Sequence, residues 1–317
     1  MHLLAPSRLW LLLPVLALGI AYVVLRRRRT APAVRHPDLA LMDAFAPRWP
    51  GWRQHLTAAA LLLAMAAMAV GLARPAQAVT VARQEAVVVL AMDVSRSMTA
   101  TDVSPTRLAA AQSAAKEFVT SAPDGYRIGL VTFDAETHTL ASPTLDRAEL
   151  LEAIDSIEPA NGTAAGDGLA TAVDVLDADA SAATADAADT YRAIVLLADG
   201  DSATGRTLAD ASQDAVDAEI PVFTIAYGTD DATIEVDGRT LDAGAAPAAI
   251  AEVAEATGGT DYSATSSGEL SAVYEEIGTT IGTAVEEQEL TVPLALAAAA
   301  LLSLAVIATT AWSPRLV

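Results

Sequence analysis

Hydrophobic and polar residues divide the chain into two kinds of segment. Three long apolar runs contain no charged residue: Leu9–Leu25, Thr57–Ala73 and Val292–Trp312. Each is long enough for a helix that crosses a bilayer, which needs roughly 17–25 apolar residues. A buried core helix is the alternative, but the first two runs flank a basic segment, which favours membrane spans. We therefore predict three transmembrane helices.

The arginines next to these runs predict how the chain crosses the membrane. Short arginine-rich loops stay on the cytoplasmic side, and the segment 26–53 carries Arg26, Arg27, Arg28, Arg29, Arg35, Arg48 and Arg53 against Asp38 and Asp43. We thus expect a multi-pass protein of the cell membrane. Its predicted parts are 1–78, with two helices (about 9–25 and 57–73) and the cytoplasmic loop 26–53; an extracytoplasmic domain, 79–290; and 291–317, with the last helix (about 292–312) and a short tail. Ala76-Gln77-Ala78 also fits a signal-peptidase site, and cleavage there would leave the last helix as an anchor.

Between the second and third runs, short apolar strands alternate with amphipathic helices. Continuous runs such as Ala86–Met92 are typical of strands buried on both faces. Strands are predicted at 86–92, 126–133, 137–142, 191–198, 221–227 and 261–264, with 137–142 antiparallel at an edge. Helices are predicted at 146–157, 168–176, 208–218, 247–257 and 269–285, the last running towards the third membrane run, and another begins with Ser104-Pro105 as its cap and first residue. This alternation predicts an α/β, Rossmann-like domain with a mostly parallel central sheet and helices on both faces.

Two segments of this domain depart from the alternation. Asp177–Thr190 consists largely of Ala and Asp, which is typical of a flexible surface loop. It is not a calcium-binding loop, because Ala182 and Ala188 stand where such a loop needs Gly and Glu. Asp237-Gly238 predicts a two-residue hairpin turn after the strand 221–227.

Composition and charge narrow the range of functions. The net charge is −21, and all 40 acidic residues except Asp38 and Asp43 lie in 79–290. This acidity argues against a nucleic-acid partner, which needs clustered Lys and Arg. The chain has no cysteine, which excludes disulfides, Cys–zinc sites and thiol catalysis. With Lys116 as the single lysine and only four histidines, neither a Schiff base nor a His-rich metal site is expected.

A carboxylate followed by two hydroxyls ends the first buried strand. Asp93, Ser95 and Ser97 alternate along the chain, and side chains at this spacing point to the same side of an extended segment. Asp199 ends another buried strand, and the carboxyl ends of parallel strands meet at one edge of a sheet. The loop that carries Thr163 adds a hydroxyl. An oxygen-only set of this kind suits Mg²⁺, Ca²⁺ or Mn²⁺ and not zinc, so the predicted metal ligands are Asp93, Ser95, Ser97, Thr163 and Asp199.

These residues resemble the metal-ion-dependent adhesion site (MIDAS) of von Willebrand factor A (VWA) domains. That motif is Asp-x-Ser-x-Ser, a distant Thr, and an Asp after a buried strand, and all five positions are filled here. The resemblance implies that the two serines and, in one state, Thr163 bind the ion directly, whereas Asp93 and Asp199 act through water. It also implies an open coordination position for an acidic residue of a protein partner.

The order of the predicted parts extends the resemblance to almost the whole chain. Two N-terminal spans, an external VWA domain and a C-terminal span are similar to the bacterial Bat-type membrane proteins, above all to their actinobacterial branch. The pattern Met98-x-Ala100-x-Asp102-x-x-Pro105-x-Arg107 continues that family's first-helix motif. Genes of this family commonly accompany MoxR-type AAA+ ATPases, so the resemblance implies a cytoplasmic ATPase partner in an assembly or chaperone-like system.

The leading hypothesis is therefore a membrane-anchored module that binds a protein through a divalent cation and is not an enzyme. A metal-independent membrane scaffold, in which the ion is only structural, stays open as an alternative. A phosphoryl-transfer hydrolase is a minor one, because Ser95 stands where such enzymes need a second Asp. For two polar residues near the motif we expect no role in binding the ion: Asp102 is predicted to be exposed or to cap a helix, and Arg96 to be solvated at the rim of the site.

Overall fold

The computed structural model describes residues 2–28, 52–182, 190–200, 204–229, 233–236, 239–242 and 247–312. They form two compact units, one of Met1–Thr80 with Val285–Val317 and one of Val81–Ala284. The sequence places the corresponding boundaries after residues 78 and 290. Most of the predicted basic loop, from residue 29 to residue 51, lies outside the described residues.

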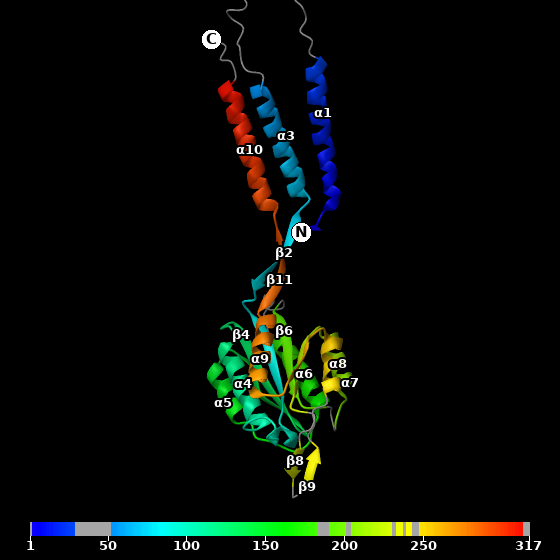
Figure 1. Cartoon of the computed structure of the whole chain (residues 1–317), viewed down its shortest axis with the longest axis vertical. Helices are drawn as coiled ribbons and strands as arrows, with labels where there is room; N and C mark the ends of the chain where they lie inside the picture. Colours follow the sequence, from blue (N-terminus) through cyan, green and yellow to red (C-terminus); the bar gives the residue numbers. More distant parts are fainter. Residues whose placement is uncertain are drawn as a thin grey trace, which may run out of the picture. The chain divides into compact units, whose positions relative to one another are not determined.

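Among its described residues, the first unit contains the α-helices α1 (Leu12–Arg28), α3 (Trp52–Leu72) and α10 (Thr291–Trp312) (Figure 1). Within the described residues, three helical segments are long and apolar enough to cross a membrane: Pro6–Arg28, which includes the short helix η1 (Pro6–Leu11), His55–Leu72 and Thr291–Ala311. They coincide with the three predicted runs. α3 and α10 pack closely because small side chains lie between them: an added Cβ on Gly71 would meet Leu294 at 3.5 Å.

A small sheet that the sequence did not predict connects chain segments far apart in sequence. It contains β1 (His2–Leu3), β2 (Pro75–Ala82) and β11 (Thr283–Glu289), in the order β1-β2-β11. The prediction of one helix over 269–285 is wrong at its end, because α9 (Ser267–Ile281) stops at Gly282 and β11 follows before α10 begins.

The second unit is built on a six-stranded sheet in the order β10-β7-β6-β3-β4-β5. Its strands are β3 (Ala86–Asp93), β4 (Tyr126–Phe133), β5 (Thr137–Thr144), β6 (Tyr191–Ala198), β7 (Val222–Tyr227) and β10 (Asp261–Ala264). Neighbours pair in parallel except β5, which is antiparallel to β4 at the edge. The predicted α/β fold with a mostly parallel sheet is thus confirmed.

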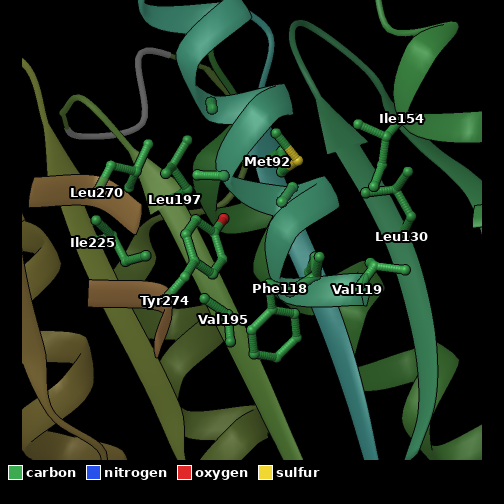
Figure 2. Close-up of a cluster of buried hydrophobic side chains, with 14 of the residues drawn as sticks. Met92, Phe118, Val119, Leu130, Ile154, Val195, Leu197, Ile225, Leu270 and Tyr274 are labelled. Atoms are coloured by element: carbon green, nitrogen blue, oxygen red, sulfur yellow. The ribbon is translucent and has the colours of Figure 1, made fainter. Parts of the chain in front are cut away.

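Helices cover the two faces of this sheet (Figure 1). They are α4 (Arg107–Ser121), α5 (Arg147–Asp155), α6 (Ala165–Ala182), α7 (Leu208–Asp217), α8 (Pro247–Thr257) and α9. One core cluster lies under α4, α5 and α9, and Figure 2 shows Phe118 and Tyr274 packed there against strand residues such as Val195. The other lies under α6, α7 and α8. Because both faces are covered, β3 is buried along its whole length.

The start of α4 differs from the prediction by two residues. Thr106, and not Ser104, is the cap: its hydroxyl accepts a hydrogen bond from the Ala109 N–H at 3.2 Å, and the helix begins at Arg107. The hydroxyl of Thr106 thereby satisfies an N–H of the first turn that has no partner within the helix. The shift matters for function, because it makes Arg107 the first residue of the helix.

The prediction of a loop over 177–190 is wrong for its first part. α6 continues to Ala182, as the high helix propensity of alanine favours, and Asp177 and Asp179 form ion pairs with Arg192 and Arg127. Residues 183–189 lie outside the described residues. The predicted hairpin is present as the antiparallel strands β8 (Thr233–Val236) and β9 (Arg239–Asp242), although its turn residues 237 and 238 are not among the described ones.

Candidate metal centre

The carboxyl end of β3 carries a buried carboxylate with one unsatisfied oxygen. Asp93 is fully buried, and its Oδ1 accepts a hydrogen bond from the Ser95 N–H at 2.7 Å. Its Oδ2 is buried and has no hydrogen-bond partner. The hydroxyls of Ser95 and Ser97 lie 2.8 Å apart. Since buried polar atoms are nearly always paired, an orphaned carboxylate oxygen beside two hydroxyls indicates a place for a ligand.

A second buried carboxylate follows the neighbouring strand. β3 and β6 pair in parallel, with Met92 opposite Leu197, so that Asp93 and Asp199 come at the same edge of the sheet. Asp199 is buried and has a hydrogen bond with the Ser97 side chain. The structure therefore brings Asp93, Ser95, Ser97 and Asp199 together, as the motif predicts.

Burial and mutual repulsion disfavour the charges of both carboxylates. Burial, and next the charge of Asp199, raise the pKa of Asp93 to about 7, against the lowering effect of hydrogen bonds from Ser95. Burial also raises the pKa of Asp199, although hydrogen bonds from Ser97 and the charge of Arg107 oppose the shift. A cation bound between the two carboxylates would favour their charged forms.

Thr163 lies on a neighbouring loop between α5 and α6. Its carbonyl oxygen accepts a hydrogen bond from the Thr204 N–H at 3.1 Å, which ties it to the segment that follows β6. The Asn161 carbonyl accepts another from the Ala135 N–H at 3.1 Å, after β4. Gly162 has φ +96°, and a Cβ there would lie 2.8 Å from that of Ala135, so only glycine fits between the two loops. Thr163 is thus held beside the ends of β4 and β6, and the structure records no direct bond from its hydroxyl to the other four residues.

The sequence did not single out Arg107 as a part of the candidate site. Its side chain is 0% exposed, and its guanidinium donates to Asp199 Oδ2 at 3.2 Å. It also forms a bidentate pair with Asp102, through Nε to Oδ1 at 2.9 Å and through a terminal nitrogen to Oδ2 at 2.7 Å. A fully buried arginine could not be recognised from an amphipathic helix pattern, in which a charge at the first turn predicts an exposed position.

Asp102 is an exposed residue, as expected, but its side chain is not free in solvent. Its side chain is 13% exposed and binds Arg107 and Thr229, whose N–H and hydroxyl donate to Oδ2 at 2.9 and 3.0 Å. Burial raises the pKa of Asp102, but the hydrogen bonds from Arg107 and Thr229 outweigh it and bring the pKa to about 2. Asp102 is therefore ionised at neutral pH and balances the buried charge of Arg107.

The donor set fits a hard divalent cation. It consists of carboxylate and hydroxyl oxygens, which Mg²⁺, Ca²⁺ and Mn²⁺ prefer. Among the described residues there is no group of three or more His, Cys, Asp or Glu side chains arranged to hold a metal. A cation at this edge of the sheet would therefore need hydroxyl oxygens as ligands besides the two carboxylates. The unpartnered Oδ2 of Asp93 is the atom that such an ion would satisfy.

Comparison with known proteins agrees with this geometry. Residues 88–202 match the model of the von Willebrand factor type A domain. The chain is 31% identical to a UPF0353 protein of Nocardia farcinica over 296 residues, which cover 89% of this chain and 88% of that protein. The chain belongs to the UPF0353 family. Another member, from Mycobacterium avium, is 32% identical over 279 residues, covering 86% of this chain and 83% of its own.

Solved structures share the fold of the second unit. BatB from Bacteroides thetaiotaomicron aligns with a TM-score of 0.53 and 23% identity, covering 62% of this chain and 98% of that chain. An aerotolerance-related membrane protein from Bacteroides fragilis aligns with a TM-score of 0.53 and 23% identity, covering 62% and 99%. This member of the UPF0353 family therefore contains a VWA domain, a type of protein-interaction module, whose fold it shares with these two proteins.

Proposed function

We propose that the protein binds a protein partner through a divalent cation (Mg²⁺, Ca²⁺ or Mn²⁺) held by its membrane-anchored VWA domain. The buried Oδ2 of Asp93, which has no hydrogen-bond partner, carries the proposal. The hydroxyls of Ser95, Ser97 and Thr163 would hold the ion, and Asp93 and Asp199 would balance its charge. The ion would offer a free coordination position to an acidic side chain of the partner.

Metal binding can be tested on the full chain in detergent. We expect Mn²⁺, followed by electron paramagnetic resonance, to bind the wild type and to be displaced by Mg²⁺. Asp93→Ala should abolish binding. Asp155→Ala is the matched control, because Asp155 is an exposed carboxylate that pairs with Lys116 on the surface. Equal binding by the wild type and Asp93→Ala would contradict the site.

Partner binding separates the adhesion hypothesis from the scaffold hypothesis. With cell membranes as the source of partners, a protein that binds in Mg²⁺ and is lost with EDTA and with Asp93→Ala supports adhesion through the ion. A partner that binds equally in Mg²⁺ and EDTA, while the protein itself still binds Mn²⁺, favours a scaffold with a structural ion.

We further propose a multi-pass topology, with the VWA domain outside the cell and the loop 26–53 inside. The three apolar helical segments and the arginines of that loop support it. Because the chain has no cysteine, single cysteines report topology cleanly. An impermeant maleimide should label Lys116→Cys on intact cells and Asp38→Cys only after permeabilisation. The reverse pattern would contradict the orientation.

A MoxR-type AAA+ ATPase is the cytoplasmic partner that we propose, on the strength of the resemblance to Bat-type proteins. A cross-linker attached at Asp38→Cys should capture the ATPase, whereas the same cross-linker at Asp155→Cys, on the external domain, should not. Failure to capture it from position 38, with the protein correctly inserted, would contradict this partner.

A further inference from the structure

Arg107 connects three separate parts of the VWA domain. It begins α4, and its guanidinium binds Asp102 in the preceding loop, Asp199 at the end of β6 and the Thr229 carbonyl after β7, the last at 3.4 Å. A fully buried guanidinium is costly to desolvate unless its donors are paired, and here they are paired with groups from all three segments. The position of Arg107 is therefore fixed jointly by the candidate metal site and by the end of β7.

Within this cluster of charges, Asp102 neutralises the guanidinium of Arg107. Arg107 faces two carboxylates: a bidentate one, Asp102, and a single oxygen of Asp199. A cation at the candidate site would compete with Arg107 for Asp199. Asp102 makes that competition mild, because it keeps the guanidinium neutralised when Asp199 turns to the cation. Without the charge of Asp102, Asp199 would be the remaining carboxylate that pairs with Arg107 in this cluster. Arg107 would then bind Asp199 more strongly and oppose its interaction with the cation.

The backbone after β7 closely follows the guanidinium. Gly228 has φ +125°, and a Cβ at this position would lie 2.1 Å from Cζ of Arg107, so the chain passes directly against the planar group. Thr229 donates two hydrogen bonds to Asp102 and accepts one from Arg107. A displacement of Arg107 must therefore displace Gly228 and Thr229.

The same backbone leads into the β8–β9 hairpin. β8 begins at Thr233, four residues after Thr229, and contacts η2 (Arg96–Thr99), the short helix that carries Ser97. In Figure 1 the hairpin extends from the lower end of the domain. The hairpin is thus tied to the candidate metal site twice, through η2 and through the contacts of Thr229 with Asp102 and Arg107.

We propose that Arg107, balanced by Asp102, is a positioning residue that couples cation binding at Asp199 to the base of the β8–β9 hairpin. This inference rests on the proposed function and extends it to a second surface of the domain. When the cation binds, the position in which the β8–β9 hairpin faces a partner changes. Arg107 acts through Asp199 and need not touch the ion.

Charge-matched variants test the coupling by the affinity for the cation. In the full chain in detergent, Asp102→Asn should weaken Mn²⁺ binding about tenfold, within the usual range of coupling between sites. Arg107→Gln combined with Asp102→Asn removes the competing cation as well, and should return the affinity to within about threefold of the wild type. Arg127→Gln combined with Asp179→Asn is the matched control, because it removes a partly buried Arg–Asp pair that lies on β4 and α6.

Hydrogen exchange supplies a readout that does not depend on the affinity. Peptides covering 228–242 should exchange more slowly when the wild type and the control variant bind Mn²⁺. The Arg107→Gln, Asp102→Asn double variant should bind Mn²⁺ with no change in the exchange of this segment. A purely structural role of the pair would instead lower the stability of the metal-free domain and leave the response to the ion intact.

The outcomes separate this inference from the proposed function. A wild type that binds Mn²⁺ but whose segment 228–242 does not respond would overturn the coupling alone. A folded Asp102→Asn variant that binds Mn²⁺ with wild-type affinity would also overturn the coupling. If that variant does not fold, hydrogen exchange of the Arg107→Gln, Asp102→Asn double variant decides the question. A wild type that binds no Mn²⁺ would overturn both proposals.

Discussion

Within the VWA domain, β3 from Ala86 to Met92 and β6 from Ala193 to Ala198 are apolar, and a carboxylate follows each run. The residues of β3 from Ala86 to Met92 are at most 1% exposed, and so are those of β6 from Ala193 to Ala198. The next residues are Asp93, which is 0% exposed, and Asp199, which is 7% exposed, and both carry a carboxyl group. Over a single residue, each strand passes from close apolar packing to a buried carboxylate.

The difference shows which part of the sheet serves stability and which serves binding. Apolar strand residues stabilise the fold by themselves, since burying them removes apolar surface from water. The strand-end carboxylates cost free energy in the metal-free domain, because burial raises the pKa of each. The proposed cation would offset this cost by neutralising the carboxylates.

The largest effect should come from the strand interior. Leu90→Ala removes a fully buried side chain of the central strand and should lower the free energy of unfolding by about 2–5 kcal/mol. Urea unfolding followed by circular dichroism measures this change. Mn²⁺ affinity of the folded fraction should stay at the wild-type value. A loss below about 1 kcal/mol would mean that the core relaxes around the cavity.

Cation binding at the strand ends should raise the free energy of unfolding of the domain by an amount comparable to this loss. Mg²⁺ at a hundredfold excess over its dissociation constant should raise the free energy of unfolding by about 2.7 kcal/mol. Ser97→Ala, which removes one proposed ligand, should reduce this gain in the same urea experiment, whereas Leu90→Ala should keep it. An equal gain in the Ser97 variant would contradict the role of that hydroxyl.

Asp93→Asn should stabilise the metal-free domain by about 1–2 kcal/mol at pH 8, the opposite sign to a core substitution. The pKa of Asp93 is raised from 3.8 to about 7 on folding, so the unfolded state ionises at lower pH than the folded state. The metal-free wild type therefore loses stability as the pH rises from about 4 to about 7. The variant should lack this loss in urea titrations from pH 4 to 8. If the metal-free variant is less stable than the metal-free wild type at pH 8, the buried carboxylate of Asp93 does not destabilise the domain as proposed.

The smallest effect should come from the exposed ion pair of Lys116 and Asp155. Its side chains are 34% and 67% exposed, so water screens the attraction. Lys116→Ala should change the free energy of unfolding by less than about 1 kcal/mol and leave Mn²⁺ binding unchanged. A larger loss would show that charge on this face stabilises the domain in a way that solvent exposure does not explain.

Strong local patterns were enough to predict the frame of the domain. β4, β6 and β10 have the predicted bounds, and for β4 and β6 the reason is that largely apolar runs bounded by turn residues define buried strands. β2 and β11 were missed because each depends on pairing with a distant segment, for which the local sequence gives no signal. α6 was predicted too short because its Ala/Asp end was interpreted by composition, although the aspartates pair with Arg127 and Arg192.

The candidate site was predictable as a motif but not as a network. Asp93, Ser95, Ser97 and Asp199 meet because parallel strands end at one edge, a rule that needs only the strand assignments. The contribution of Arg107 depends on three partners separated by up to 122 residues, which no spacing along the chain reveals. Likewise, only the folded structure shows that Oδ2 of Asp93 is buried without a hydrogen-bond partner.

The most direct test of the central claim is the position of an ion relative to the ends of β3 and β6. Crystals of the protein soaked in Mn²⁺ and measured at the manganese absorption edge give that position by anomalous scattering. We expect one strong peak among the side chains of Asp93, Ser95, Ser97, Thr163 and Asp199. A map from fully soaked crystals with no peak among them, or with manganese bound elsewhere on the domain, would contradict it.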